Sequence, residues 1–209
     1  MRAQVRLLSL LLQVTALTAA VPAFASSAEQ LVREARAHEA AQKEELAIRR
    51  YTEALSLDPT LGDAYLGLGD LRARRGDARE AERVYSVALE HVPSLRVALA
   101  GRARVRRALG MHDEAERDLL AYALETSDRA ALKELAVWYG EDGRAPAQLA
   151  IWRRLLSLAE KAGDVSLTRE ARTTVRALQI LVGPADPVSA PSEGDDVRRA
   201  FARMAKRGG

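Results

Sequence analysis

The stretch GDAREAERVYSVALEHVP, residues 76–93, recurs in altered form on both sides of itself. Upstream, residues 43–59 read KEELAIRRYTEALSLDP, and downstream, residues 110–125 read GMHDEAERDLLAYALE. Alignment of the three segments gives two columns with a spacing of 34 residues, one of Ala47, Ala81 and Ala115 and one of Tyr51, Tyr85 and Leu119. Matched residue types at two identical spacings indicate an internal repeat.

Each repeat predicts two helices joined by a tight turn. In the best repeat, Gly76 and Asp77 form the turn: glycine accepts the left-handed backbone that ends a helix, and aspartate can cap the next one. Apolar residues then recur at spacings of four and three, which is typical of one helix face; they are Ala81, Tyr85 and Ala88. Pro93 ends this helix, and Ser94 is a candidate cap for the following one.

The pattern resembles the tetratricopeptide repeat, a 34-residue helix pair with small and aromatic residues at fixed places. The residues in register with that signature are Tyr65, Leu68, Gly69, Ala81, Tyr85 and Pro93. Arg72 departs from it, since the signature has tyrosine there. The neighbouring repeats keep part of the set, namely Ala47, Tyr51 and Pro59 in the first and Ala115 and Leu119 in the third.

The resemblance implies an all-α fold, a right-handed α-solenoid of about four helix pairs over residues 28–161. The repeats are expected near residues 28–61, 62–95, 96–128 and 129–162, with Pro146 in the first turn of the last helix of the array. A capping helix is expected over 164–182, with an apolar stripe of Leu167, Ala171, Val175, Leu178 and Leu181.

The first 25 residues are expected to be a signal peptide. A basic start precedes an apolar run over 7–21, and the small residues at 23–25 favour cleavage near Ala25. The expected location is therefore the periplasm or cell envelope of a bacterium. An uncleaved membrane anchor is the alternative, but a spanning helix needs about 20 apolar residues, and polar side chains interrupt this run.

The C-terminal part predicts a flexible linker over 183–195, rich in Pro, Ser, Ala and Gly, and then a basic segment over 196–207. Two interpretations of the basic segment remain open. It is either a short helix that contacts an anionic membrane or envelope polymer, or a tail that is disordered or docks back on the array. Membrane contact is the less favoured of the two.

Composition and motifs give no catalytic constellation, so the chain is not expected to be an enzyme. The absence of cysteine excludes disulfides, thiolate metal sites and a cysteine nucleophile. His38, His91 and His112 lie far apart, and no cofactor or metal is expected. Gly67 and Gly69 begin like a phosphate loop but lie within a predicted helix, and core packing is favoured over a sugar platform for Trp138 and Trp152. The nearly balanced charge, +3 for the whole chain, argues against nucleic acid.

The resemblance implies a non-catalytic interaction scaffold with a protein or peptide partner in a concave groove lined by the first helices. The positions that carry over are Arg36, Leu66, Asp70, Arg74, Arg104, Arg107 and Lys133. Guanidinium groups there would suit carboxylates on the partner, although a generally arginine-rich surface explains them equally. The carboxylate clamp of chaperone-binding members is absent, since its positions hold Val32, Arg36, Gly67, Val97 and Gly101. The alternative function is an assembly factor that associates with an anionic surface through the basic segment.

Overall fold

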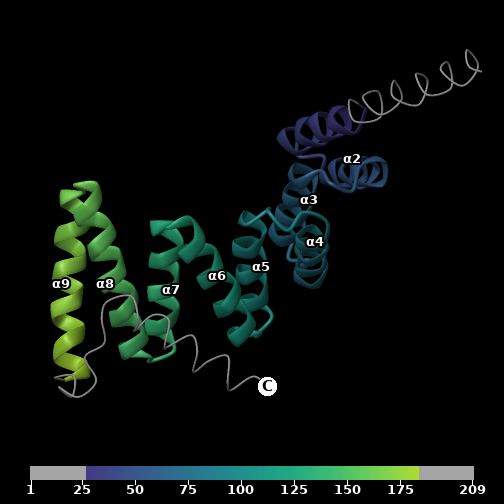
Figure 1. Ribbon diagram of the computed structural model, residues 1–209. Coiled ribbons are helices and arrows are strands. Elements are labelled where there is room, and N and C mark those ends of the chain that lie inside the picture. The colour runs from purple at the N-terminus through teal and green to yellow at the C-terminus, as the bar shows by residue number, and fades with distance from the viewer. Residues whose placement is uncertain (1–26, 184–209) are drawn as a thin grey trace, which may run out of the picture. The chain divides into compact units, whose positions relative to one another are not determined.

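The computed structural model describes residues 27–183, which contain nine helices and no strand (Figure 1). The first helix covers residues 27–40. The others are α2 (Glu44–Leu57), α3 (Gly62–Arg74), α4 (Ala78–His91), α5 (Val97–Ala108), α6 (His112–Thr126), α7 (Arg129–Glu141), α8 (Ala145–Ala162) and α9 (Val165–Val182). The all-α helical-repeat fold is thus confirmed, while the right-handed sense of the array stays a prediction.

Three predicted segments lie outside the described residues: the signal peptide, the linker beyond Gly183 and the basic segment over 196–207. Within residues 27–183, none of the helices has the length and apolar character that crossing a membrane requires.

The chain divides into two compact units, each described by itself. Unit 1 is Met1–Asp118 and unit 2 is Leu119–Gly209, so the boundary falls inside α6. In unit 1, α2 packs on α3, α3 on α4 and α4 on α5, and α3 also contacts α5. This last contact joins the first helices of two successive repeats. In unit 2, α7 packs on α8 and α8 on α9.

The turn between α3 and α4 has the predicted glycine but a different use of its aspartate. Gly76 adopts the left-handed backbone, with φ of 82°. Asp77 makes no side-chain cap on α4; its carboxylate instead accepts from Arg72 Nη1 at 3.0 Å. Arg72, the departure from the repeat signature, therefore ties the end of α3 to the turn. Ser94 is not a cap either, since α5 begins after Arg96.

Side-chain caps occur at two aspartates of unit 2 instead. Asp128 accepts from the backbone N–H groups of Ala130 and Ala131 at the start of α7. Asp164 accepts from the N–H of Leu167 at the start of α9. Both satisfy N–H groups that a helix leaves without an internal partner.

The core of unit 1 joins a tyrosine of one repeat to a glycine of the next. Tyr51 and Tyr85 are each 1% exposed. A Cβ atom on Gly67 would lie 2.3 Å from Cζ of Tyr51, and one on Gly101 would lie 2.6 Å from Cζ of Tyr85. Gly69 of α3 meets the same Tyr85 ring, at 2.6 Å from its Cε1. The backbones of α3 and α5 thus rest directly on aromatic rings.

The last helix of the described chain, α9, turns an apolar stripe toward α8. Leu167, Ala171, Val175 and Leu178 are buried as predicted, and Trp152 packs beside Leu149 against the last two of them. Leu181 was assigned to this stripe wrongly, since it is 75% exposed. The first turn of α8 has no large apolar side chain before Leu149.

Both tryptophans belong to the packing of unit 2. Trp138 of α7 is 9% exposed, and Trp152 of α8 is partly buried against the cluster that includes Leu149 and Val175. This agrees with the packing interpretation rather than with a sugar platform. Pro146 lies in the first turn of α8, where its missing N–H costs little.

The contact between Tyr85 and Gly101 predicts that Gly101→Ala has opposite effects on stability in the wild type and in a Tyr85→Leu variant. In the wild type, Gly101→Ala should lower the free energy of unfolding, because overpacking costs about 1–3 kcal/mol and outweighs the gain of about 1 kcal/mol in helix propensity. In Tyr85→Leu, which copies the leucine of the third repeat, the same change should be neutral or stabilising. Urea unfolding of the four proteins measures both effects, and an equal cost in the two backgrounds would contradict the contact.

Candidate functional site

Two ion pairs link the first helices of the first two repeats. Arg36 Nη2 lies 2.7 Å from Asp63 Oδ2, and the Arg74 guanidinium pairs with Glu39. In each pair one residue comes from the helix over 27–40 and the other from α3. The packing of successive first helices therefore brings together charged residues that are 27 and 35 positions apart.

The same surface contains the hydroxyl groups of the two core tyrosines. Tyr51 Oη donates to Glu39 Oε2 at 2.6 Å, and Tyr85 Oη donates to Asp70 Oδ1. The pKa of both tyrosines is raised well above the ordinary value. Burial is the largest cause, and the hydrogen bonds to the carboxylates and the carboxylate charges add to it. The positive charges of Arg104 and Arg74 act on the pKa of Tyr85 in the opposite direction.

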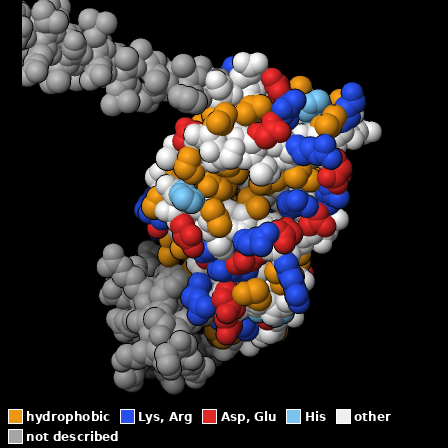
Figure 2. Space-filling view, turned by 90° about the vertical axis from the view of Figure 1, so that its right-hand side faces the viewer, with side chains coloured by type: hydrophobic (Ala, Val, Ile, Leu, Met, Phe, Trp, Pro, Cys, Tyr) orange, Lys and Arg blue, Asp and Glu red, His pale blue; other side chains and the backbone are white. Residues whose placement is uncertain are grey.

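We call this surface the first-helix face of unit 1. Its charged members come from three successive first helices and are Arg36, Glu39, Asp63, Asp70, Arg74 and Arg104. These six groups are three positive and three negative ones, so their charges balance. Mixing of the two signs is also visible elsewhere, since blue and red side chains are interspersed on the side of the molecule in Figure 2.

The structure changes the interpretation of several predicted groove residues. Arg36 and Arg74 were expected to offer guanidinium groups to a partner, but each already pairs with a carboxylate of this chain. Asp70 accepts from Tyr85, and Leu66 is partly buried against the core of the second repeat. Arg104 is exposed. A partner carboxylate at Arg36 or Arg74 would therefore have to compete with an internal one.

The remaining two predicted residues also have contacts within this chain. Arg107 Nη1 is 3.2 Å from Nδ1 of His112 at the start of α6. Lys133 belongs to unit 2, where its Nζ donates to the carboxylate of Glu170 on α9 at 2.7 and 3.0 Å. Unit 1 therefore contains six of the seven predicted groove residues, and Lys133 of unit 2 pairs with the capping helix.

Gly67 and Gly101 explain why a carboxylate clamp does not fit on this face. Both occupy positions where clamp members of the resembled family carry a polar or basic side chain. Here any Cβ atom at these positions would collide with Tyr51 or Tyr85, at 2.3 and 2.6 Å from the ring carbon Cζ. The chain also contains no asparagine. A partner must be recognised by other contacts.

A buried charged network lies between the second and third repeats of unit 1, and sequence reasoning missed it. Asp118 of α6 is 7% exposed and receives Arg102 in two hydrogen bonds of 2.7 and 2.8 Å. Arg106 reaches the same carboxylate at 2.8 Å and Glu82 of α4 at 2.6 Å. The spacing of four between Arg102 and Arg106, which places both on one helix face, was the available signal.

The three histidines have ordinary surroundings. The His91 ring stacks on Tyr65, with centroids 6.1 Å apart and planes at 11°, and His38 is half-buried. Among the described residues, no group of three or more His, Asp or Glu side chains is arranged to hold a metal ion. No buried side-chain nitrogen or oxygen in that part of the chain lacks a hydrogen-bond partner.

Neither a family model nor a curated protein matches the sequence, but solved structures do. A tetratricopeptide repeat protein from Parabacteroides merdae has a TM-score of 0.62 at 17% identity, over 87% of this chain and 67% of that one. A crystal structure of MamA gives 0.59 at 18%, over 65% and 80%. YrrB, described as a tetratricopeptide repeat protein with an unusual peptide-binding site, gives 0.56 at 17%, over 76% and 82%.

These likenesses establish the class of the fold. The chain has the tetratricopeptide-repeat fold, which the residues of the second repeat predict.

The buried network predicts a large difference between two acidic residues. Asp118→Ala should lower the free energy of unfolding by about 3–5 kcal/mol, because it leaves two arginines without their shared carboxylate in a mostly buried site. Glu90→Ala removes an exposed carboxylate of α4 and should change the free energy of unfolding by less than about 0.5 kcal/mol. Urea unfolding monitored by circular dichroism compares the two, and similar costs would contradict the network.

The two tyrosines predict an alkaline loss of stability. Their pKa values are raised in the folded chain, so folding favours the neutral hydroxyl. The resulting stability is complete below the unfolded pKa of about 10 and is lost as the pH rises above it. The urea midpoint should fall between pH 9 and pH 11, and less steeply in Tyr51→Phe/Tyr85→Phe. Equal slopes would contradict the assignment, and Arg79→Ala, an exposed change on α4, is the control.

Proposed function

We propose that this protein is a non-catalytic interaction scaffold that binds a segment of another protein along the first-helix face of unit 1. The observation that carries the proposal is the row of charged groups that successive first helices place side by side, as in the pairs of Arg36 with Asp63 and Arg74 with Glu39. Regular presentation of side chains from stacked repeats is the usual way in which such arrays form an extended binding surface.

The charge balance of the face favours one kind of partner. Because the face has as many negative as positive groups, a purely acidic segment would meet repulsion at Asp70 and Asp63. A segment with both signs of charge could exchange ion pairs with the internal ones at little cost. Apolar contact is available at Leu66, which is only partly buried. We therefore expect a mixed-charge segment with an apolar anchor.

Similar structures support the same class of function. The peptide-binding site named for YrrB belongs to that protein, and its fold matches this chain over 76% of the length. A helical-repeat surface without a carboxylate clamp fits a peptide ligand that is held by side-chain contacts rather than by its terminal carboxylate.

We also propose that the scaffold acts in the cell envelope. The proposal rests on the N-terminal sequence, in which a basic start, an apolar run and the small residues near Ala25 have the order of a cleavable export signal. The partner would then be another envelope protein.

Site-specific photo-crosslinking in intact cells tests the binding face. A photoreactive residue in place of Leu66 or Arg104 should give the same crosslinked partner, and that product should fractionate with the envelope. The same residue in place of Arg79 or Glu90, both exposed on α4, is the matched control on a second helix and should give little of it. Equal yields from the two pairs of positions would reject the first-helix face, and recovery of the product from the cytoplasm would reject the envelope location alone.

A further inference from the structure

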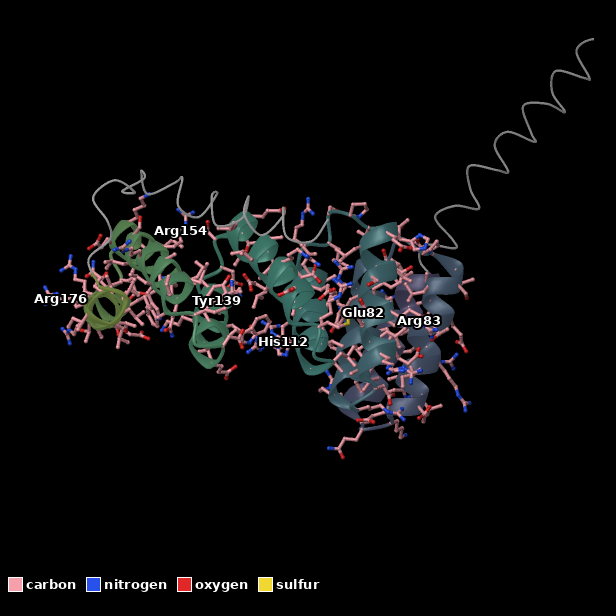
Figure 3. All side chains as sticks on the ribbon, turned by 90° about the horizontal axis from the view of Figure 1, so that it is seen from below. Glu82, Arg83, His112, Tyr139, Arg154 and Arg176 are labelled. Atoms are coloured by element: carbon pink, nitrogen blue, oxygen red, sulfur yellow. The ribbon has the colours of Figure 1, made fainter. Side chains whose placement is uncertain are left out.

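The outer face of α9 has a row of arginines that the packing of unit 2 does not use. Arg169, Arg172 and Arg176 are exposed and follow each other at spacings of three and four, which places them on one side of the helix. They line an open hollow of about 620 Å³ together with Thr168, Thr173 and Glu160. Arg176 points away from α7 in the view of Figure 3.

The charge of this hollow is poorly compensated. Arg172 pairs with Glu160, with Nη2 2.7 Å from Oε1. Within the described range 27–183, Arg169 and Arg176 have no acidic partner. Three guanidinium groups therefore face one carboxylate, in contrast to the balanced first-helix face of unit 1. Such a row suits two or more closely spaced carboxylates.

The chain itself supplies that chemistry shortly after α9. Beyond Gly183 the sequence continues for 26 residues, and it contains the acidic group Glu193, Asp195 and Asp196. We propose that residues 193–196 bind to the arginine row of α9 in the same molecule.

The geometry of the helix end permits this return. Gly183 has φ of 77°, which ends the helix and turns the backbone away from its axis. Glu193 lies ten residues further on, a length that spans at most about 33 Å. The eleven residues from Arg172 to Gly183 cover only about 16 Å along the helix. The segment between Gly183 and Glu193 is thus long enough for the acidic group to reach Arg172 and Arg169. Because the group is tethered to α9, its local concentration near these arginines is high.

An apolar residue marks the same path. Ile180 lies one turn beyond Arg176 on the arginine side of α9 and is 83% exposed. A chain that leaves Gly183 and returns along this side passes Ile180 before it reaches the arginines. Val188 falls between Gly183 and Glu193 in the sequence, so the order of an apolar and then an acidic residue matches the order on the helix.

Paramagnetic relaxation in the purified full chain tests the proposal. The chain has no cysteine, so Ser192→Cys provides one site for a spin label. We expect amide signals of Thr168, Arg172 and Arg176 to broaden, and the broadening to weaken in high salt. Arg169→Glu/Arg176→Glu should reduce it to the level seen in α3, while Arg33→Glu/Arg79→Glu, at exposed positions of unit 1, should leave it unchanged.

A charge exchange makes the result specific. Combining Arg169→Glu/Arg176→Glu with Glu193→Arg/Asp195→Arg should restore the broadening of α9. Three outcomes would overturn the proposal: no broadening of α9 in the wild type, broadening that persists after charge reversal, or broadening that arises only when spin-labelled chains are mixed with unlabelled isotope-enriched ones. The last would show that a second copy, and not the same chain, occupies the row.

Discussion

The stacking of the repeats in unit 1 depends on the contact of an aromatic ring with a bare backbone. Tyr51 meets Gly67, and Tyr85 lies against both Gly69 and Gly101. In each case the ring fills the space that a Cβ atom would occupy, so two helices approach more closely than side chains would otherwise allow. This close approach also allows α3 to touch α5. The charged groups of the first-helix face lie side by side for the same reason.

The ring contact also shapes the chemistry of the surface. Each ring lies between the first helix of its own repeat and that of the next, and its hydroxyl group donates to the former, where Glu39 and Asp70 are the acceptors. Glu39 is thus held by a neutral donor as well as by the Arg74 cation, and Asp70 is held by the Tyr85 hydroxyl. The glycines beneath leave no side chain at the positions where related binding surfaces place theirs. Recognition on this face is therefore left to the flanking charged residues and Leu66.

The repeat spacing predicted much of this arrangement, because small and aromatic columns such as Ala81 and Tyr85 reflect packing that recurs with every unit. The partner of each ring was harder to predict. Gly67 and Gly69 are both small, and a single sequence does not indicate which of them faces the preceding repeat. Ion pairs such as that of Arg74 with Glu39 could not be predicted from the sequence, because a long arginine side chain can contact any of several nearby carboxylates. Asp118 contradicts the expectation that aspartate lies outside, and only its two arginines make its burial tolerable.

The pairing of a ring with the glycine sixteen positions later has a consequence for how this chain can diverge by duplication. In the third repeat, Leu119 takes the place of the tyrosine, and the residue sixteen positions later is Leu135. The side chain is therefore smaller than tyrosine at the first position and larger than glycine at the second. The complementary pair straddles two repeats. A copy of residues 62–95 inserted before residue 129 would place Glu134, and not a glycine, sixteen positions after the copied Tyr85. The unit that can be exchanged without strain therefore runs from one second helix to the following first helix, out of phase with the sequence repeat.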